Sequence, residues 1–404
     1  MQERYDVCVI GGGAAGMSAA IAAAEGGCSV CIVDKNKKLG RKLYATGNGR
    51  CNLANTDMDK CHYHSYEEEH ERTQFLNQSI GEYPNTGLFE FLDSMGVYTQ
   101  ANQGYYYPVS MQASAVVWAF LDRLKALGVT AKTGKTVTEI KKAEGGYLVS
   151  CEEPLYAKNI ILATGGCSYA SLGGSTSGYA LAQSLGLSVT KQSPALCGMY
   201  TSEDTEAIKG VRAACSAWIE TDKGIHRQSG ELQLTEYGLS GIMIFNLASM
   251  VGRALETQKE VTVYIDFLEH ITRERFMQGR CLERNIYGYL NAFMPDKLAR
   301  YILESAGVSC KQPLSDVTTD MLEKIYDRCR CYPFHVKALR DYENAQVTAG
   351  GVMLADVDAQ TMEVKGQRGM YVAGELLDMD GDCGGYNLTF AILTGRKAGE
   401  NCHA

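Results

Sequence analysis

Long apolar runs are missing from this sequence of 404 residues, because no stretch reaches the roughly 18 apolar residues needed to span a bilayer. The first residues also lack the charged, apolar and cleavage regions of a signal peptide, so we expect a cytoplasmic protein without a membrane partner. Basic residues form no clusters, and 39 Lys and Arg against 47 Asp and Glu give a net charge of -8. Nucleic acid is therefore not an expected partner.

Disulfide and metal chemistry have little support in the sequence. The fifteen cysteines are an odd number, and Cys28 and Cys31 lie in or beside apolar strand patterns, where a free thiol packs as a small core residue. The histidines are scattered, and His62, His64 and His70 fall in a polar segment that is typical of a solvated face. We predict neither a disulfide framework nor a metal site.

The amino-terminal pattern predicts a strand, a tight turn and a helix. The apolar run at 5–13, YDVCVIGGG, ends in glycines, and the alanine-rich stretch at 14–27, AAGMSAAIAAAEGG, follows directly. Gly11, Gly13 and Gly16 give GxGxxG, in which the first permits the turn, the second lets a pyrophosphate approach the backbone, and the third lets helix and strand pack closely. This context predicts a dinucleotide-binding site, with phosphates at the positive end of the helix.

The next apolar run ends at Asp34, whose carboxylate is placed to accept a hydrogen bond from a ribose hydroxyl. An acid would repel a 2′-phosphate, so FAD or NAD is favoured over NADP. The segment at 40–55, GRKLYATGNGRCNLAN, has neither strand alternation nor helical period, and we predict an extended loop. Its glycines, Gly47 and Gly49, would allow close backbone approach, and its three cations suit a long anionic ligand such as FAD.

Two later segments also predict strands that end in glycines. The stretch at 157–174, AKNIILATGGCSYASLGG, indicates a buried strand followed by a glycine pair, and another strand is predicted over 370–373. Gly384 and Gly385 then turn into a helix whose positive end would stabilise negative charge on a reduced flavin. An NAD-only domain has no use for this distant segment, and no second GxGxxG follows a strand to indicate a separate NADH domain.

Taken together, these motifs resemble the BaiN-like (YhiN-like) family of FAD-dependent oxidoreductases in the two-dinucleotide-binding flavoprotein superfamily. The resemblance rests on GRKLYATGNGRCN, GELQLTEYGLSG, TAGGV and GELLDMDGDCGGYNLTFAILTGRKAG, and runs over essentially the whole chain. It implies an α/β fold in which a discontinuous Rossmann-like FAD-binding domain carries an inserted β-barrel-like domain and a small helical subdomain. The boundaries we expect are 1–193 plus 345–404 for the FAD-binding domain, 194–267 plus 331–344 for the mostly strand-like insert, and 268–330 for the helical subdomain.

The resemblance also implies where FAD lies. Val137 would meet the adenine through its backbone, Glu375 would take the position of the acid that contacts the ribitol, and residues 384–388 would lie against the isoalloxazine. The full set of predicted cofactor-binding residues is Gly11, Gly13, Ala14, Ala15, Gly16, Asp34, Lys35, Gly40, Arg41, Lys42, Thr46, Gly47, Asn48, Gly49, Arg50, Cys51, Asn52, Val137, Ala163, Thr164, Gly165, Gly374, Glu375, Gly384, Gly385, Tyr386, Asn387 and Leu388.

Catalytic side chains cannot be picked out by motif, because the flavin itself supplies the redox chemistry. Tyr386, on the glycine turn nearest the flavin, and Tyr105, in a run of three tyrosines, are candidates for lining the active site. Cys51 is not expected to be a redox thiol, since disulfide reductases of this superfamily use two cysteines separated by four residues, and position 46 is Thr.

Two mechanisms are open at this point. In the first, NAD(P)H binds transiently over the flavin, and the hydride passes on to an unsaturated small organic substrate; the resemblance favours this reductase. In the second, a small amine-type donor reduces FAD, and oxygen reoxidises it to give hydrogen peroxide. A flavin-bound protein that binds or modifies RNA is disfavoured by the acidic net charge.

Overall fold

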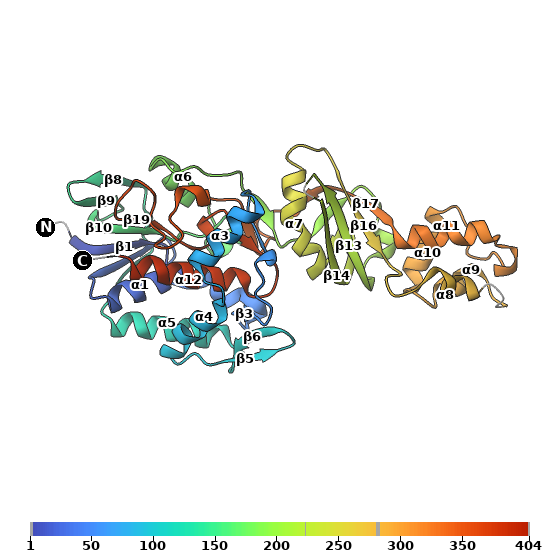
Figure 1. The fold of residues 1–404 in the computed structure, drawn as a ribbon, viewed down its shortest axis with the longest axis horizontal. Coiled ribbons are helices and arrows are strands. Elements are labelled where there is room, and N and C mark those ends of the chain that lie inside the picture. Colours follow the sequence, from blue (N-terminus) through green and yellow to red (C-terminus); the bar gives the residue numbers. More distant parts are fainter. Residues whose placement is uncertain (1–2, 223, 280–282, 403–404) are drawn as a thin grey trace. The chain divides into compact units, whose positions relative to one another are not determined.

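A computed structural model describes residues 3–222, 224–279 and 283–402 of the chain (Figure 1). The chain divides into two compact units, one of Met1–Ser193 with Val347–Ala404 and one of Pro194–Gln346. We call the first the sheet unit and the second the barrel unit. The barrel unit is therefore an insertion in the sequence of the sheet unit.

A seven-stranded sheet forms the centre of the sheet unit among the described residues, in the order β7-β2-β1-β10-β9-β8, with β19 beside the carboxyl half of β10. The pairs β7-β2, β2-β1, β1-β10 and β10-β19 are parallel, and β9 and β8 return antiparallel as a hairpin. The predicted strand at 370–373 is confirmed as β19. The bounds are β1 (Glu3–Ile10), β2 (Val30–Asp34), β7 (Thr130–Thr133), β8 (Glu139–Ala143), β9 (Gly146–Ser150), β10 (Leu155–Leu162) and β19 (Met370–Val372).

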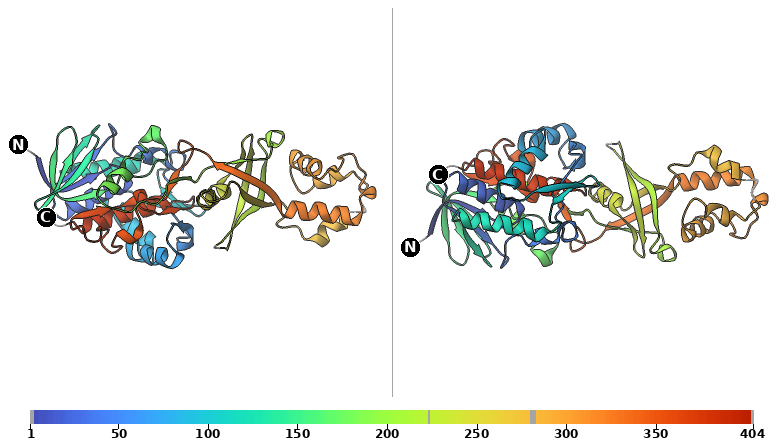
Figure 2. Two further views of the ribbon diagram at one scale, coloured as in Figure 1. Left: turned by 90° about the horizontal axis from the view of Figure 1, so that it is seen from above. Right: turned by 90° about the horizontal axis from the view of Figure 1, so that it is seen from below.

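Helices α1 and α12 pack against each other beside this sheet, as the blue and red ribbons of Figures 1 and 2 show. Close packing follows from Gly395 and Gly399, because a Cβ at either position would overlap the backbone of Ala15 or Ala19. The helices of this unit are α1 (Ala14–Glu25), α2 (Arg41–Ala45), α3 (Glu69–Ser79), α4 (Pro84–Ser94), α5 (Ala113–Ala126), α6 (Ser177–Ser184) and α12 (Tyr386–Glu400), and its short strands are β3 (Ala54–Asn55), β4 (Tyr63–His64), β5 (Thr99–Asn102), β6 (Tyr105–Pro108), β18 (Val347–Ala349) and β20 (Asp380–Gly381).

The prediction of an extended loop over residues 40–55 is wrong, because the segment contains regular secondary structure. The segment forms helix α2, a 3₁₀ turn over Thr46–Gly49 and the short strand β3. Leu43 is the buried residue of α2, which anchors this short helix to the rest of the unit. Five helical residues make little more than one turn, so no hydrophobic periodicity could show in the sequence.

The barrel unit holds a closed barrel in the order β12-β15-β14-β13-β16-β17. Its core continues into the helices that follow, where Phe276, Leu298 and Ile325 belong to the same buried cluster. The sequence did not predict helix α7, which lies within the stretch predicted to be strand-like. Its residues are largely apolar, and a continuous apolar run does not distinguish a buried helix from a buried strand. The bounds are β11 (Ser193–Ala195, which crosses the unit boundary), β12 (Met199–Thr201), β13 (Arg212–Thr221), β14 (Gly224–Thr235), β15 (Gly238–Ser240), α7 (Ile242–Ala254), β16 (Val261–Asp266), α8 (Arg273–Gln278), α9 (Ile286–Leu290), α10 (Asp296–Ser305), α11 (Thr319–Arg330) and β17 (Tyr332–Leu339). Residues 280–282 of the predicted helical stretch lie outside the described residues.

The cysteines of the described residues are free thiols, most of them buried. Cys28 and Cys31 have CxxC spacing, which occurs in metal and redox sites. Both are buried, and burial raises the pKa of each thiol, to about 12 for Cys31. Among the residues that the structure describes, no three His, Cys, Asp or Glu side chains form a metal-binding group. In the same described part of the chain, no helix has the length and apolar character to cross a membrane.

Candidate functional site

The carboxyl ends of β1, β2, β10 and β19 meet at one edge of the sheet, and each strand is followed by predicted site residues. The backbone N–H of Gly11 donates to the carbonyl of Val33 at 2.9 Å, and that of Ala163 donates to the carbonyl of Ile10 at 2.9 Å. Open parallel sheets bind ligands at this edge. Residues 11–16, 34–35, 163–165 and 374–375 are thereby brought together.

The three glycines of the first turn have different surroundings. A Cβ on Gly11 would overlap the carbonyl of Ala163, and one on Gly16 would overlap the carbonyl of Gly11. By contrast, apart from the adjoining residues of the chain, no described atom lies within 4 Å of a Cβ built on Gly13. Gly13 also caps α1, which begins at Ala14, so the open space lies at the positive end of a helix. This space fits an anionic ligand close to the backbone.

Asp34 shapes this turn from the end of β2. Its carboxylate is 8% exposed and accepts hydrogen bonds from the N–H of Gly12 and the N–H of Asn36, both at 2.6 Å. The loop that carries Val137 lies beside it, because Lys135 N–H donates to the carbonyl of Asp34 at 3.0 Å. The side chain predicted to meet ribose and the backbone predicted to meet adenine are therefore neighbours.

The segment 40–55 links the first glycine turn to the carboxyl-terminal part of the chain. Gly40 N–H donates to the carbonyl of Gly12 at 2.8 Å. Lys42 Nζ lies 3.0 Å from Glu375 Oε2, and Glu375 Oε1 accepts from Thr348 N–H at 3.0 Å. Glu375 thus joins two distant segments that were both predicted to surround one ligand, and it is also held by Thr348 of β18, a residue outside the predicted cofactor-binding set.

Like Lys42, the other two cations of this segment contact protein groups. The guanidinium of Arg41 donates to Asn36 Oδ1 at 3.1 Å and to the carbonyl of Ser171 at 2.9 Å. Arg50 lies 5.2 Å from the ring centroid of Tyr107. In this conformation Arg41 and Arg50 contact protein groups, and the N-terminus of α1 places positive charge at the open space at Gly13.

Two buried polar atoms at this edge have no hydrogen-bond partner among the described residues. They are Asn52 Oδ1 and Thr164 Oγ1. Leaving a buried polar atom unpaired costs about 1–3 kcal/mol, so such atoms are normally satisfied by a ligand or water. The adjacent Cys51 is fully buried, and burial raises its pKa to about 11, which disfavours a reactive thiolate.

The glycine turn before α12 packs directly on the end of the 40–55 segment. Gly385 has φ of 95°, and a Cβ there would lie 2.5 Å from the backbone nitrogen of Ala54. The Asn387 side chain clamps the turn, accepting from Gly381 N–H at 2.9 Å and donating to Gly381 O at 2.7 Å. The two distant glycine-rich segments singled out in the sequence are thus in contact. The remaining predicted residues of these two segments lie close by in the chain: Thr46, Gly47, Asn48 and Gly49 form the 3₁₀ turn after α2, Gly384 lies in the glycine turn, and Leu388 lies in the first turn of α12.

The two candidate active-site tyrosines have different surroundings. The ring of Tyr386 is buried, and its hydroxyl donates to the carbonyl of Asp57 at 2.8 Å. Tyr105 is half-buried, and its ring would lie 3.3 Å from a Cβ built on Gly384. Tyr105 is therefore at the glycine turn with part of its surface exposed, whereas the Tyr386 hydroxyl is already bonded to the protein.

The prediction that His62 and His64 lie on a solvated face is wrong. His64 is buried, and both imidazoles bond to the buried carboxylate of Asp382, at 3.0 Å from His62 and 2.9 Å from His64. The sequence signal that was overlooked is DMDGD at 378–382, in which every second residue is an acid. Its partners lie more than 300 positions away, so the local polar pattern could not reveal the pairing.

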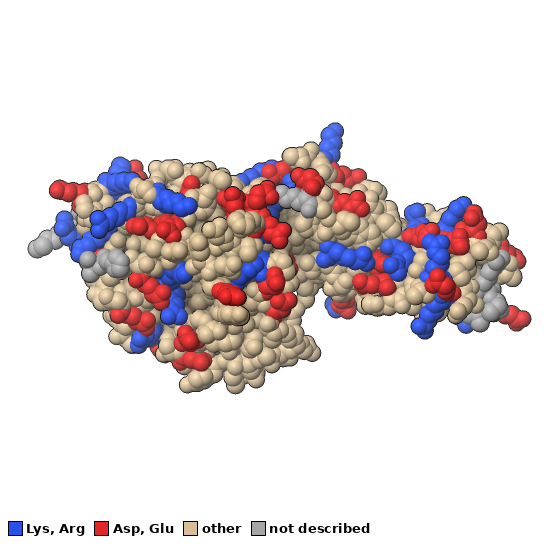
Figure 3. Space-filling view, viewed as in Figure 1, with Lys and Arg blue, Asp and Glu red and all other residues tan. Residues whose placement is uncertain are grey.

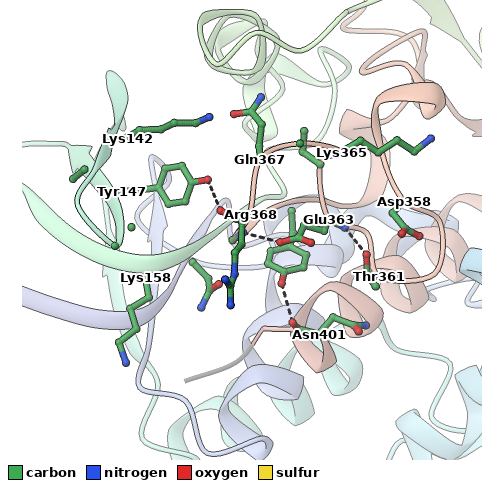
Figure 4. A pocket seen from close by; sticks show the side chains of 18 residues that line it. Lys142, Tyr147, Lys158, Asp358, Thr361, Glu363, Lys365, Gln367, Arg368 and Asn401 are labelled. Carbon is green, nitrogen blue, oxygen red and sulfur yellow. Dashed lines mark hydrogen bonds between the residues drawn. The ribbon is translucent and has the colours of Figure 1, made fainter.

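The cavity drawn in Figure 4, with a volume of about 1150 Å³, lies elsewhere. It surrounds the amino end of β19, where Tyr147 and Tyr371 donate to the carbonyls of Arg368 and Asn401, both at 2.8 Å. Ligands of parallel sheets bind at carboxyl ends. We therefore do not assign this cavity to the dinucleotide.

Charge on the drawn surface of Figure 3 is mixed, with Lys and Arg interspersed among Asp and Glu. Many Lys and Arg side chains are paired with acids, for example Arg212 with Glu231 at 2.9 Å and Lys132 with Glu3 at 3.0 Å. No continuous basic patch is visible on this face. A phosphate backbone would find no cationic stripe there.

Comparison with known proteins decides the family. Residues 5–401 match the family described as the HI0933-like protein Rossmann domain. This chain belongs to that family. The HI0933-like family is the one that the sequence motifs resembled, so the resemblance is confirmed, and the protein is an FAD-dependent oxidoreductase.

Relatives of this HI0933-like protein carry two kinds of name. It is 35% identical over 402 residues to the 3-dehydro-bile acid delta(4,6)-reductase of Clostridium scindens, covering 97% of each chain. It is 25% identical over 404 residues to a ribosomal RNA dihydrouridine synthase of Haemophilus influenzae, covering 97% of this chain and 96% of that one.

A solved structure shares its fold. The 3-ketosteroid-delta4-(5alpha)-dehydrogenase from Rhodococcus jostii has a TM-score of 0.50 at 15% identity, covering 99% of this chain and 97% of that one. The unfilled space at Gly13 and the unpaired atoms of Asn52 and Thr164 fit the FAD that this family binds.

Proposed function

We propose that this enzyme reduces a carbon–carbon double bond of a small unsaturated organic substrate, using FAD and taking electrons from NAD(P)H. The observation that carries the proposal is the 35% identity, over nearly the full length of both chains, to a protein named as a reductase of a 3-dehydro-bile acid. FAD supplies hydride transfer when bound. The protein's own residues bind and orient it.

We assign three contacts to this chain in the proposal. The space at Gly13 receives the pyrophosphate at the N-terminus of α1. Thr164 Oγ1 donates to FAD, and Asn52 Oδ1 accepts from it, which satisfies both buried atoms. Glu375, held by Lys42 and Thr348, faces the ribitol.

Anaerobic mixing with NADH or NADPH tests the electron donor. We expect the visible absorbance of the bound flavin to bleach within seconds, and an unsaturated steroid-type ketone to restore it. Dithionite serves as the control, because it shows that the bound flavin can be reduced. Bleaching by dithionite but by neither nicotinamide would contradict the proposal and favour the oxidase, which peroxide release from a small amine donor in air would then establish.

Ribosomal RNA is the second candidate substrate, supported by the names of relatives at 25% and 26% identity. The net charge of -8 speaks against it, since binding of a phosphate backbone depends on cationic side chains. The same experiment separates the two substrates. We expect the reduced flavin to be reoxidised anaerobically by the unsaturated ketone and not by ribosomal RNA stripped of its modifications.

Replacing Glu375 with Ala tests the placement of the ribitol. We expect FAD binding to weaken by about 1.5–3 kcal/mol, the usual worth of a hydrogen bond to a charged group. The matched control is Glu400→Ala, which removes an exposed ion pair with Arg396 at 2.6 Å and is expected to leave FAD binding unchanged. Fluorescence titration of flavin-free protein measures both. Equal affinity of Glu375→Ala and wild type would refute the assignment.

A further inference from the structure

One buried carboxylate is shared by two imidazoles directly before the glycine turn of α12. Asp382 Oδ2 lies 3.0 Å from His62 Nδ1, and Asp382 Oδ1 lies 2.9 Å from His64 Nε2. The Asp382 side chain is 4% exposed, so both bonds lie in a region of low dielectric. Burial raises the pKa of Asp382, but the hydrogen bonds from His62 and His64 outweigh burial and lower it overall.

His62 connects this carboxylate to the first residue of α12. Its ring stacks on the ring of Tyr386, with centroids 4.8 Å apart and planes 27° from parallel. Its second nitrogen, Nε2, lies 3.3 Å from Asp57 Oδ2, while the carbonyl of Asp57 accepts the Tyr386 hydroxyl at 2.8 Å. The imidazole therefore touches the helix end that follows the Gly384-Gly385 turn.

A proton on His62 is favoured by these partners. The hydrogen bond to Asp382 raises the pKa of His62 above its ordinary 6.5, and Asp57 adds to this, against a lowering by burial. The titratable groups that interact with His62 are Asp57 and Asp59 on its own segment, Asp382 after β20 and Tyr386 on α12. His64 on β4 shares Asp382 with it, and Cys61 and Cys383 adjoin His62 and Asp382 in the chain.

Protonation of His62 adds one positive charge beside Asp57, Asp382 and Tyr386. Burial raises the pKa of Cys383 to about 12 and raises that of Tyr386, so both stay neutral through the physiological range. Below its raised pKa His62 carries a positive charge, which is lost as the pH rises through that value. The stability that the charged pair with Asp382 gives the fold is lost over the same pH range.

We infer that His62 is a positioning residue for FAD, whose proton sets the charge at the N-terminus of α12 and thereby the redox potential of the cofactor. The inference rests on the proposed function and on the placement of the isoalloxazine at residues 384–388 that the sequence predicts. Reduced FAD bears more negative charge than oxidised FAD, so a cation beside this helix end stabilises the reduced form. Loss of the proton removes that preference.

The test is the midpoint potential of the FAD-loaded protein, measured by photoreduction with a reference dye from about pH 5.5 to about pH 9. His62→Gln removes the titrating charge but keeps an amide that can bond to Asp382. His62→Arg keeps a cation at every pH, and guanidinium groups both stack on aromatic rings and pair with carboxylates. His70→Gln, at an exposed histidine of α3, is the matched control.

We expect the wild-type potential to follow that of His62→Arg at low pH and that of His62→Gln at high pH. The expected separation is about tenfold in relative affinity for reduced FAD, which is about 30 mV for a two-electron couple. His70→Gln should match wild type. By linkage, reduction of FAD should raise the pKa of His62 by about one unit, which NMR of the imidazole measures.

Parallel curves for wild type and His62→Gln across the whole range would overturn the inference, because proton uptake by FAD itself is common to both proteins. If His62→Gln fails to retain FAD, equal potentials of wild type and His62→Arg at high pH would overturn it instead. No nicotinamide and no substrate enter the measurement. A protein that NADH does not reduce therefore still gives a decisive potential curve.

Discussion

Gly13→Ala is expected to weaken FAD binding at least tenfold, about 1.4 kcal/mol, while the flavin-free protein keeps its stability to within about 1 kcal/mol. Apart from the adjoining residues of the chain, the new methyl group would meet no described protein atom within 4 Å, so we expect the fold to be unchanged. It would instead occupy the space where we place the pyrophosphate. Fluorescence titration with FAD and thermal unfolding of the flavin-free protein measure the two quantities.

Gly16→Ala, three residues further on in the first turn of α1, is the matched control. A Cβ there would overlap the carbonyl oxygen of Gly11, a backbone atom that cannot rotate away. We expect the flavin-free protein to lose about 1–3 kcal/mol of stability, as overpacked positions do. The assignment of the space at Gly13 fails if Gly13→Ala binds FAD as tightly as wild type, or if it unfolds as readily as Gly16→Ala.

The second large effect is expected at the contact between α1 and α12. Gly395→Ala and Gly399→Ala each place a methyl group into the backbone of α1, at Ala15 and Ala19 respectively. Each is expected to destabilise the FAD-loaded protein by about 1–3 kcal/mol. Because the two positions share one helix contact, we expect the double variant to lose less than the sum.

Gly87→Ala is the control for that contact, because Gly87 lies in α4, which also packs on α12. A Cβ there would lie 3.8 Å from Leu393 Cδ2, an ordinary contact. Since Gly inside a helix costs about 0.5–1 kcal/mol relative to Ala, this variant should be as stable as wild type or more so. Melting temperatures that are unchanged in Gly395→Ala would refute the tight helix contact.

The dinucleotide turn could be predicted because its requirements are local. Gly11, Gly13 and Gly16 must stand at fixed spacing between a strand and a helix, and Asp34 must end the next strand, so the pattern appears in consecutive residues. The Gly384-Gly385 turn before α12 was predictable for the same reason. Short elements were not, since α2 spans only Arg41–Ala45 and shows no period.

The sequence by itself determined the α/β class and the glycine turns, because each depends on neighbouring residues, and it determined the choice of FAD because two separate glycine-rich segments can each be recognised locally. Only the tertiary structure decided which of the predicted residues have partners. It paired Lys42 with Glu375, left Asn52 Oδ1 and Thr164 Oγ1 unpaired, and buried His64 against Asp382. These partners stand hundreds of positions apart, and a pairing across that distance leaves no periodic or spacing signal in a single chain.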